Sequence, residues 1–295
     1  MPFLMNAILI PVVYTLLSAG TVLATGGGDP VLVGAGDIAQ CWLGKVSWFT
    51  GVEATAALLD RIEGTVFTTG DNAYSDGTAE EFHNCYDPTW GRHKARTRPS
   101  PGNHDYNTLD ASPYYTYFGD SAGPPGKGYY SYDLGAWHIV SLNSNLAAET
   151  GSAQERWLRE DLASHQTACT LAYWHHPLFS SGRHGNTPRM QAIWQVLYEF
   201  GVDVVVNGHA HSYERFAPQN PDGKLDVERG IRQFVVGTGG ARLRRFHATH
   251  ANSEVRNNST WGVLKLTLHA AGYDWEFVPA RNGIFHDAGS ARCVP

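Results

Sequence analysis

The stretch Gly70-Asp71-Asn72-Ala73-Tyr74 follows the apolar run Thr65–Thr69, which has the pattern of a buried strand. A Gly-Asp pair at this point places a carboxylate where the strand ends. Because a carboxylate has two oxygens, Asp71 can bridge two cations, and Tyr74 offers a phenol oxygen three positions later. A turn with a solvated Asp and a packed Tyr would have the same sequence, so the surrounding chain is needed to decide.

A second apolar run, Val31–Ala35, leads into Gly36-Asp37 in the same way. A helix expected over Val52–Ile62 separates it from the strand before Asp71. This strand–helix–strand order predicts two parallel neighbours, whose carboxyl ends meet at one edge of the sheet. Open sheets bind ligands at that edge, so we expect Asp37 and Asp71 to lie close together.

Further metal-capable side chains follow strands or tight turns later in the chain. They occur in Asn103-His104-Asp105, in His175-His176-Pro177 and in Gly208-His209-Ala210-His211. Oxygen and imidazole ligands in this mixture suit cations such as Fe, Mn and Zn. A single histidine would more often be a core or surface residue, but the repeated placement at strand ends favours a metal site. We assign no site role to His83, His93, His138, His165, His247, His250, His269 and His286.

The rest of the chain is expected to continue the alternation of helices and strands. Helices are predicted over 79–90, 152–165 and 189–200, and strands over 129–133, 138–142, 169–174, 202–206, 233–236, 263–269 and 273–278. The Tyr-, Pro- and Gly-rich segment 106–128 is predicted to be an ordered surface excursion. Segment 244–259 is the best candidate for a mobile loop.

Length and composition indicate an ordinary folded globule, of one large α/β domain or two small ones. The chain has 295 residues, of which 42% are hydrophobic and 17% are charged, so it is long enough to bury a substantial core. No repeat and no linker divides it. The formal net charge of −6 leaves no basic field for a polyanion, so nucleic acid is not expected as a tight partner. The oligomeric state is left open.

The N-terminal segment resembles a secretory signal. Residues 7–17 are apolar and Val22-Leu23-Ala24 fits a signal-peptidase site, although no Lys or Arg precedes the apolar run. The run is short for a membrane span and contains Pro11, so no stable membrane anchor is expected. We predict a signal peptide over 1–24, a single domain over 25–295, and a secreted or periplasmic location.

The four cysteines form an even set that agrees with an oxidising compartment. Cys41 and Cys85 each lie shortly after a candidate site segment. We therefore predict the pairs Cys41–Cys85 and Cys169–Cys293. No Cys-x-x-Cys occurs, so a zinc knuckle is not indicated.

Taken together, these motifs resemble the calcineurin-like metallophosphoesterases, and within them the purple acid phosphatases. The resemblance covers roughly residues 30–245 and rests on the segments that contain Asp37, Asp71, Asn103, His175 and the His209/His211 pair, in the family's order. It implies an α/β fold, a four-layer α/β/β/α sandwich of two mixed sheets flanked by helices, with a binuclear metal site at the carboxyl edge of the strands. A small single-domain form is expected.

The resemblance also implies a ligand set. The first metal would be held by Asp37, Asp71, Tyr74 and His211, and the second by the shared Asp71 with Asn103, His175 and His209. His175 is preferred over His176 because the family's ligand stands two positions before the proline. The expected cofactors are Fe(III) at the Tyr74 site and Fe(II), Zn or Mn at the second site.

One departure from the wider superfamily supports the narrower assignment. The superfamily usually has a histidine ligand two positions after the first Asp, and Ala39 stands there instead. Purple acid phosphatases place a phenolate ligand where Tyr74 stands. The missing histidine and the added tyrosine compensate for each other.

The function implied is hydrolysis of small phosphate monoesters by a hydroxide that the two metals make available. His104 would stabilise the developing charge or protonate the leaving group, with Asp105 orienting it, and His184 would be a second substrate-facing histidine. One alternative is a phosphodiesterase of the same fold that acts on nucleotides or lipid headgroups. A more distant alternative is a non-catalytic secreted binding protein, although its metal ligands would not be expected to remain complete.

Overall fold

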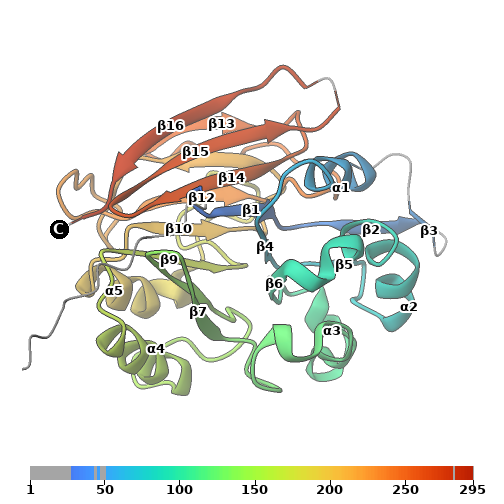
Figure 1. Cartoon of the computed structure of the whole chain (residues 1–295), viewed down its shortest axis with the longest axis horizontal. Helices are drawn as coiled ribbons and strands as arrows, with labels where there is room; N and C mark the ends of the chain where they lie inside the picture. The colour runs from blue at the N-terminus through green and yellow to red at the C-terminus, as the bar shows by residue number, and fades with distance from the viewer. Residues whose placement is uncertain (1–27, 43–44, 47–50, 282, 295) are drawn as a thin grey trace, which may run out of the picture.

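Two mixed β-sheets pack face to face and carry most of the fold (Figure 1). A computed structural model describes residues 28–42, 45–46, 51–281 and 283–294. The first sheet has the order β16 (Asp287–Arg292), β15 (Gly272–Pro279), β14 (Gly262–His269), β1 (Val31–Ala35), β4 (Thr65–Thr69) and β6 (Thr97–Ser100). The second has the order β13 (Ser253–Asn257), β11 (Tyr213–Phe216), β12 (Arg232–Val236), β10 (Val204–Asn207), β9 (Cys169–Trp174), β8 (Trp137–Ser141) and β7 (Tyr130–Leu134).

Each sheet contains a block of parallel strands. In the first sheet β1, β4 and β6 run in the same direction, and in the second β8, β9, β10 and β12 do so. The remaining pairs are antiparallel, including β1 with β14 and β11 with β12. A small third sheet joins β3 (Lys45–Val46), β2 (Ala39–Trp42) and β5 (Ala73–Tyr74). The parallel blocks direct several strand ends to one edge of the molecule.

Helices cover the outer faces. In Figure 1, α4 (Ala153–Ser164) and α5 (Gln191–Glu199) lie together beside the second sheet, whereas α1 (Val52–Leu59) lies against the first, near β14. Two shorter helices, α2 (Ala79–Glu81) and α3 (Ser112–Phe118), lie near the end of β6. The predicted four-layer α/β/β/α arrangement of two mixed sheets is confirmed.

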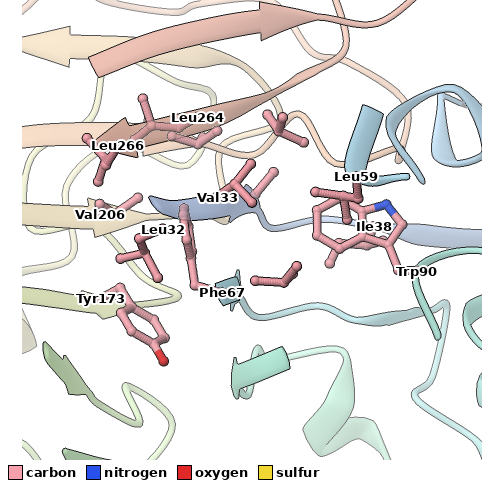
Figure 2. Close-up of a cluster of buried hydrophobic side chains, with 14 of the residues drawn as sticks. Leu32, Val33, Ile38, Leu59, Phe67, Trp90, Tyr173, Val206, Leu264 and Leu266 are labelled. Atoms are coloured by element: carbon pink, nitrogen blue, oxygen red, sulfur yellow. The ribbon is translucent and has the colours of Figure 1, made fainter. Parts of the chain in front are cut away.

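Alternation along the strands sorts side chains between two hydrophobic layers. In β9, Leu171 and Tyr173 join the layer between the sheets, while Ala172 and Trp174 face α4 and α5. This is the period-2 pattern of a strand that is buried on both faces. Figure 2 shows the inner layer, where the rings of Phe67 and Tyr173 meet across the two sheets with centroids 5.7 Å apart.

Several predicted elements differ in extent. The helix expected over 79–90 stops being α-helical after Glu81, continues as a π-helical turn over Phe82–Tyr86, and ends before Pro88, which has no N–H to donate. Segment 106–128 is not only a surface excursion, because it contains α3 and buries Tyr114 and Phe118. The predicted mobile loop over 244–259 includes strand β13, which pairs with β11.

The disulfide Cys169–Cys293 is present as predicted, with the two Cα atoms 5.5 Å apart. Cys85 is also disulfide-bonded, but the side chain of Cys41, its predicted partner, lies outside the described residues, as does the predicted signal peptide over 1–24. Within the described ranges, no helix has both the length and the apolar character needed to cross a membrane.

Candidate metal centre

The site lies where five parallel strands end. β1 leads to Asp37, β4 to Asp71, β9 to His175 and β10 to His209, while β6 leads to Asn103. All of these strands belong to the parallel parts of the two sheets, so their carboxyl ends share one edge. Residues more than 170 positions apart in the sequence are brought into contact here: the His209 N–H donates to Asp37 Oδ2 at 2.8 Å.

The backbone turns sharply at each of these points. Asp37, Asp71 and His209 have φ values of 59°, 52° and 67°, in the left-handed region that non-glycine residues seldom occupy. Such conformations concentrate at functional sites because the surrounding structure has to hold them. Each follows a glycine in the sequence, so the chain can reverse within two residues and aim the side chain into the edge between the sheets.

Tyr74 is at the centre of the first group of side chains. Its Oη lies 2.7 Å from Asp37 Oδ1, 2.8 Å from Asp71 Oδ2 and 3.2 Å from His211 Nε2. His211 Nε2 is in turn 3.2 Å from Asp37 Oδ1. Ala39, where the superfamily's histidine would stand, is fully buried and pairs with Ala73 directly before Tyr74. The phenol of Tyr74 therefore contacts Asp37, Asp71 and His211 from a position next to Ala39, where the superfamily has its histidine.

His175 is at the centre of the second group. Its Nε2 lies 3.3 Å from Asp71 Oδ2, 3.0 Å from Asn103 Oδ1 and 3.2 Å from His209 Nδ1. Asp71 thus belongs to both groups, as its proposed bridging role requires. The structure brings all seven predicted ligand side chains together through direct contacts.

The imidazole tautomers fit the binding of cations. His175 Nδ1 donates to the carbonyl of Thr69 at 2.7 Å, and His211 Nδ1 donates to the carbonyl of Arg242 at 2.8 Å. The Nε2 lone pairs of neutral His175 and His211 therefore point into the group, as in histidine ligands held by a second hydrogen bond. In this state, His175 Nε2 offers a lone pair that faces His209 Nδ1 at 3.2 Å, and a cation between the two nitrogens would bind both rings when His209 carries its proton on Nε2.

Electrostatics within the group are strongly perturbed. Burial alone raises the pKa of the Asp37 and Asp71 carboxyls, but His211 beside Asp37 and His175 beside Asp71 outweigh it and hold both pKa values below their usual range. Burial would lower the pKa of His175, yet Asp71 and then Asp37 raise it to about 9. Two ionised carboxylates buried this deeply require positive charge, from imidazolium or from metal.

Tyr74 is held as a neutral phenol when no cation is present. Burial and then the charges of Asp37 and Asp71 raise its pKa well above 10. A bound cation inverts this balance because its own charge is the largest in the site. A phenolate here would therefore need a strong Lewis acid.

His104 and His184 lie at the open side of the group. The His104 ring packs on Tyr74 with centroids 4.4 Å apart, its side chain is 33% exposed, and its Nε2 is 3.9 Å from Asp71 Oδ2. His184 is exposed, and its ring lies 4.5 Å from that of His209. Both rings therefore border the group of candidate ligands and are accessible to solvent.

Asp105 does not orient His104 as predicted. Its buried carboxylate accepts hydrogen bonds from the backbone N–H of Gly102 at 2.8 Å and from Asn72 Nδ2 at 3.0 Å. The His104 Nδ1 instead contacts the carbonyl of Ser75. Asp105 ties the two ligand loops together, and burial together with the Asp71 charge raises its pKa to about 7. Sequence spacing could not reveal this, because the side chain turns back into the loop.

His176 is a neighbour of the group that the sequence analysis set aside. Its Nδ1 accepts from Ser144 Oγ at 2.8 Å and faces Arg189 Nη2 at 3.2 Å, so the proton of the neutral ring is on Nε2. The ring lies 4.5 Å from that of His209. Burial and then the charges of His175 and His209 lower its pKa far below the usual value. The only sequence feature that could have indicated this position of His176 is the pair of adjacent histidines before Pro177.

Comparison with known proteins agrees with this geometry. The family model of the calcineurin-like phosphoesterases matches residues 32–213. Purple acid phosphatase 21 from Arabidopsis thaliana is 30% identical over 267 residues, which are 79% of this chain and 57% of that protein. Purple acid phosphatase 15 from the same plant is 31% identical over 198 residues, covering 59% and 37% of the two chains. This chain therefore matches less than two thirds of the length of either relative.

Solved structures show the same fold. A purple acid phosphatase from yellow lupin seeds superposes with a TM-score of 0.77 at 20% identity, covering 90% of this chain and 54% of the other. A structure of PhoD superposes with a TM-score of 0.60 at 13% identity, covering 90% and 70%. On the family match and these relatives, the chain belongs to the calcineurin-like phosphoesterase family and, within it, is similar to the purple acid phosphatases.

Proposed function

We propose that this protein is a purple acid phosphatase-like hydrolase that cleaves small phosphate monoesters with the help of two metal ions. The observation that carries the proposal is the convergence of seven ligand side chains around the shared carboxylate of Asp71. In the proposed assignment, Asp37, Asp71, Tyr74 and His211 hold the first metal, and Asp71, Asn103, His175 and His209 hold the second. Such a pair supplies Lewis-acid binding of phosphoryl oxygens and a lowered pKa for a bound water.

His104 is the proposed proton donor to the leaving group. Its Nδ1–H donates to the carbonyl of Ser75, which fixes the ring over Tyr74 and leaves Nε2 to carry or release a proton. Because the side chain is one third exposed, the leaving group of an ester can reach it. His184 is proposed to donate a hydrogen bond to a phosphoryl oxygen. Burial and the nearby charges of His211, Arg244 and Arg183 lower its pKa and favour the neutral ring.

Removing Asp71 tests the site as a whole. We expect Asp71→Ala to lose at least one of two bound metals and to reduce kcat by roughly a thousandfold or more, since both ions share this ligand. Asp222→Ala, which removes a carboxylate that is 68% exposed, serves as the matched control. Metal analysis and turnover of an aryl phosphate monoester and the corresponding diester are measured on the same samples. Undiminished metal content and activity in Asp71→Ala would refute the proposal, and faster turnover of the diester would reassign the substrate class.

Tyr74 tests the metal identity separately. A phenolate on Fe(III) gives a visible charge-transfer band, so we expect purified protein to be coloured and Tyr74→Phe to be colourless. The phenyl ring keeps the packing against His104 and His211. A colourless native protein with full activity on Zn or Mn alone would remove Fe(III) from the proposal while leaving the two-metal site.

We also propose that the protein is exported. The Cys169–Cys293 disulfide supports an oxidising compartment. N-terminal sequencing of protein recovered from the host's extracellular or periplasmic fraction is expected to begin at Thr25. Intact Met1 on protein that stays in the cytoplasm would contradict export.

A further inference from the structure

A basic hollow lies next to the metal centre. It has a volume of about 460 Å³ and is lined by Arg183, Arg242, Leu243, Arg244, Arg245 and His247. We call these six residues the arginine pocket. None of them is acidic. Four arginines around one hollow are unexpected in a chain whose formal net charge is −6.

The arginines of the pocket are exposed and lack protein counter-charges. Elsewhere arginines are paired: Arg215 contacts Asp287 at 2.8 Å and Arg92 contacts Asp60 at 2.9 Å. Across the described ranges of the chain, no carboxylate pairs within 4.0 Å with any arginine of the pocket. Like charges held together in this way repel one another, and a bound anion would relieve the repulsion.

The backbone that carries these arginines is fixed to the metal centre. The carbonyl of Arg242 accepts from His211 Nδ1 at 2.8 Å, and the Arg244 N–H donates to the carbonyl of His211 at 2.9 Å. Further along, the His247 N–H donates to the carbonyl of Ser181 at 3.0 Å. The segment is thus tied down at both ends although it contains no helix or strand between residues 241 and 248.

His184 connects the pocket with the metal ligands. Its ring packs on His209 at 4.5 Å, and it follows Arg183 directly in the sequence. The Arg244 N–H donates to the carbonyl of His211 at 2.9 Å, so the segment that carries Arg244 also lies against one of the candidate ligand residues. An ester bound at the metals with its phosphoryl group beside His184 would therefore have the pocket within reach of its other end.

We propose that the arginine pocket binds a second anionic group of the substrate, so that the preferred substrates are phosphate esters that carry a further phosphate or a carboxylate. This inference rests on the proposed phosphatase function of the metal centre. Arginine suits the task because its planar fork forms paired, charge-assisted hydrogen bonds with phosphate and carboxylate oxygens. The pocket, at about 460 Å³, has room for a phosphate or a carboxylate together with the part of the substrate that carries it.

Matched substrates test the proposal. Alkyl phosphates, α,ω-alkanediol bisphosphates and ω-carboxyalkyl phosphates of increasing chain length differ only in the distal group. At the best length we expect the bisphosphate to exceed the alkyl phosphate in kcat/KM by about tenfold, the effect of one charge-assisted hydrogen bond. The carboxylate series distinguishes a general anion site from a phosphate site. In the double variant Arg244→Gln/Arg245→Gln, the ratio should fall towards one.

Arg61→Gln is the control, because Arg61 is an exposed arginine that follows α1 and lies outside the pocket. Its ratio of bisphosphate to alkyl phosphate turnover should equal that of the native protein, and thermal unfolding checks that both variants are folded.

Calorimetric titration with alkane bisphosphonates and monophosphonates measures the same preference without turnover. Two results would overturn the proposed role of the pocket. One is an equal kcat/KM and an equal affinity for mono- and bis-anions at every chain length; the other is a preference for the bis-anion that persists in the double variant. Failure to hydrolyse any ester would overturn the phosphatase function, while a bisphosphonate preference would still support the pocket.

Discussion

At the scale of single residues, the site depends on how closely two loops approach each other. A Cβ atom on Gly102 would lie 2.1 Å from Asp71 Oδ1 and 2.2 Å from the Asp71 backbone nitrogen. Only a residue without a side chain leaves room for the bridging carboxylate here. The same contact brings the N–H of His104 to 2.8 Å from Asp71 Oδ1.

We therefore expect Gly102→Ala to displace Asp71 and to weaken metal binding, with a loss of about 1–3 kcal/mol in the free energy of unfolding from overpacking. Gly126→Ala provides the control, because Gly126 has a φ of +73° but nothing within 4 Å of an added Cβ. It should lose stability through backbone strain and keep its metals. Metal stoichiometry and denaturant unfolding are measured on both variants. Two metals bound to Gly102→Ala with native affinity would show that the loops can separate without harm.

The convergence of six candidate ligands was predictable because each follows a strand or a tight turn in the sequence: Asp37, Asp71, Asn103, His175, His209 and His211. Tyr74 was expected only from the family resemblance. Asp71 follows a run of five residues that is buried in the structure as expected, and His175 follows another. The role of Asp105 was not predictable. Its direction is set by backbone N–H groups of Gly102 and Asn72, and no periodicity encodes which way a loop carboxylate turns.

At the scale of elements, the strands that were missed lack the apolar runs on which prediction depends. β13 and β16 lie at sheet edges and alternate between exposed and half-buried residues. They are strands because a neighbour offers a free edge, which is a property of the tertiary structure. β6 contains Pro99, a residue that central strands exclude, but β6 is an edge strand and edge strands tolerate the missing N–H.

A buried histidine joins the elements around β8. His138 Nδ1 lies 2.9 Å from Asp133 Oδ1 on β7, and its Nε2 lies 2.9 Å from Asp161 Oδ2 on α4. The ring also stacks on His165 with centroids 4.3 Å apart, and Ser131 Oγ donates to Asp161 Oδ1. Burial lowers the pKa of His138, but the two aspartates outweigh it and raise the pKa above 6.5. The imidazolium therefore links a helix to two strands.

This linkage predicts a dependence of stability on pH. Because the folded-state pKa is raised, the contribution of His138 is fully present below its ordinary pKa of about 6.5 and is lost as the pH rises through the folded-state pKa. We expect His138→Gln to cost about 1–3 kcal/mol at pH 6, since Asp161 loses a charged donor, and less at pH 9. Denaturant unfolding across this range, with exposed His83→Gln as the control, measures the difference. A deficit that stays constant from pH 6 to pH 9 would rule out the imidazolium as its source.

At the scale of the whole molecule, the two sheets are fixed together by contacts that do not involve the candidate metal ligands. The carboxylate of Asp287 on β16 of the first sheet accepts from Tyr213 Oη at 2.6 Å and pairs with Arg215 Nε at 2.8 Å, both on β11 of the second sheet. The disulfide makes a second connection, because Cys169 begins β9 and Cys293 follows β16. Cys169 is at the opposite end of β9 from His175, so the disulfide joins the sheets at the end of this strand that carries no candidate ligand.

The disulfide allows a test of whether stability and metal binding are separable. β9 begins at Cys169 and delivers His175 at its other end, and six residues of strand span roughly 20 Å. The bond closes a separation of 124 residues, so we expect Cys169→Ala/Cys293→Ala to lower the free energy of unfolding by about 2–5 kcal/mol. Below its unfolding temperature, the variant should bind both metals and hydrolyse esters as the native protein does, because the strand ends that carry the ligands are held by the parallel parts of the two sheets. Calorimetry, metal analysis and turnover are compared at a temperature at which both proteins are folded. A variant that is folded yet has lost a metal would show that the connection between the sheets also sets the geometry of the ligands, and that stability and catalysis are coupled across the length of β9.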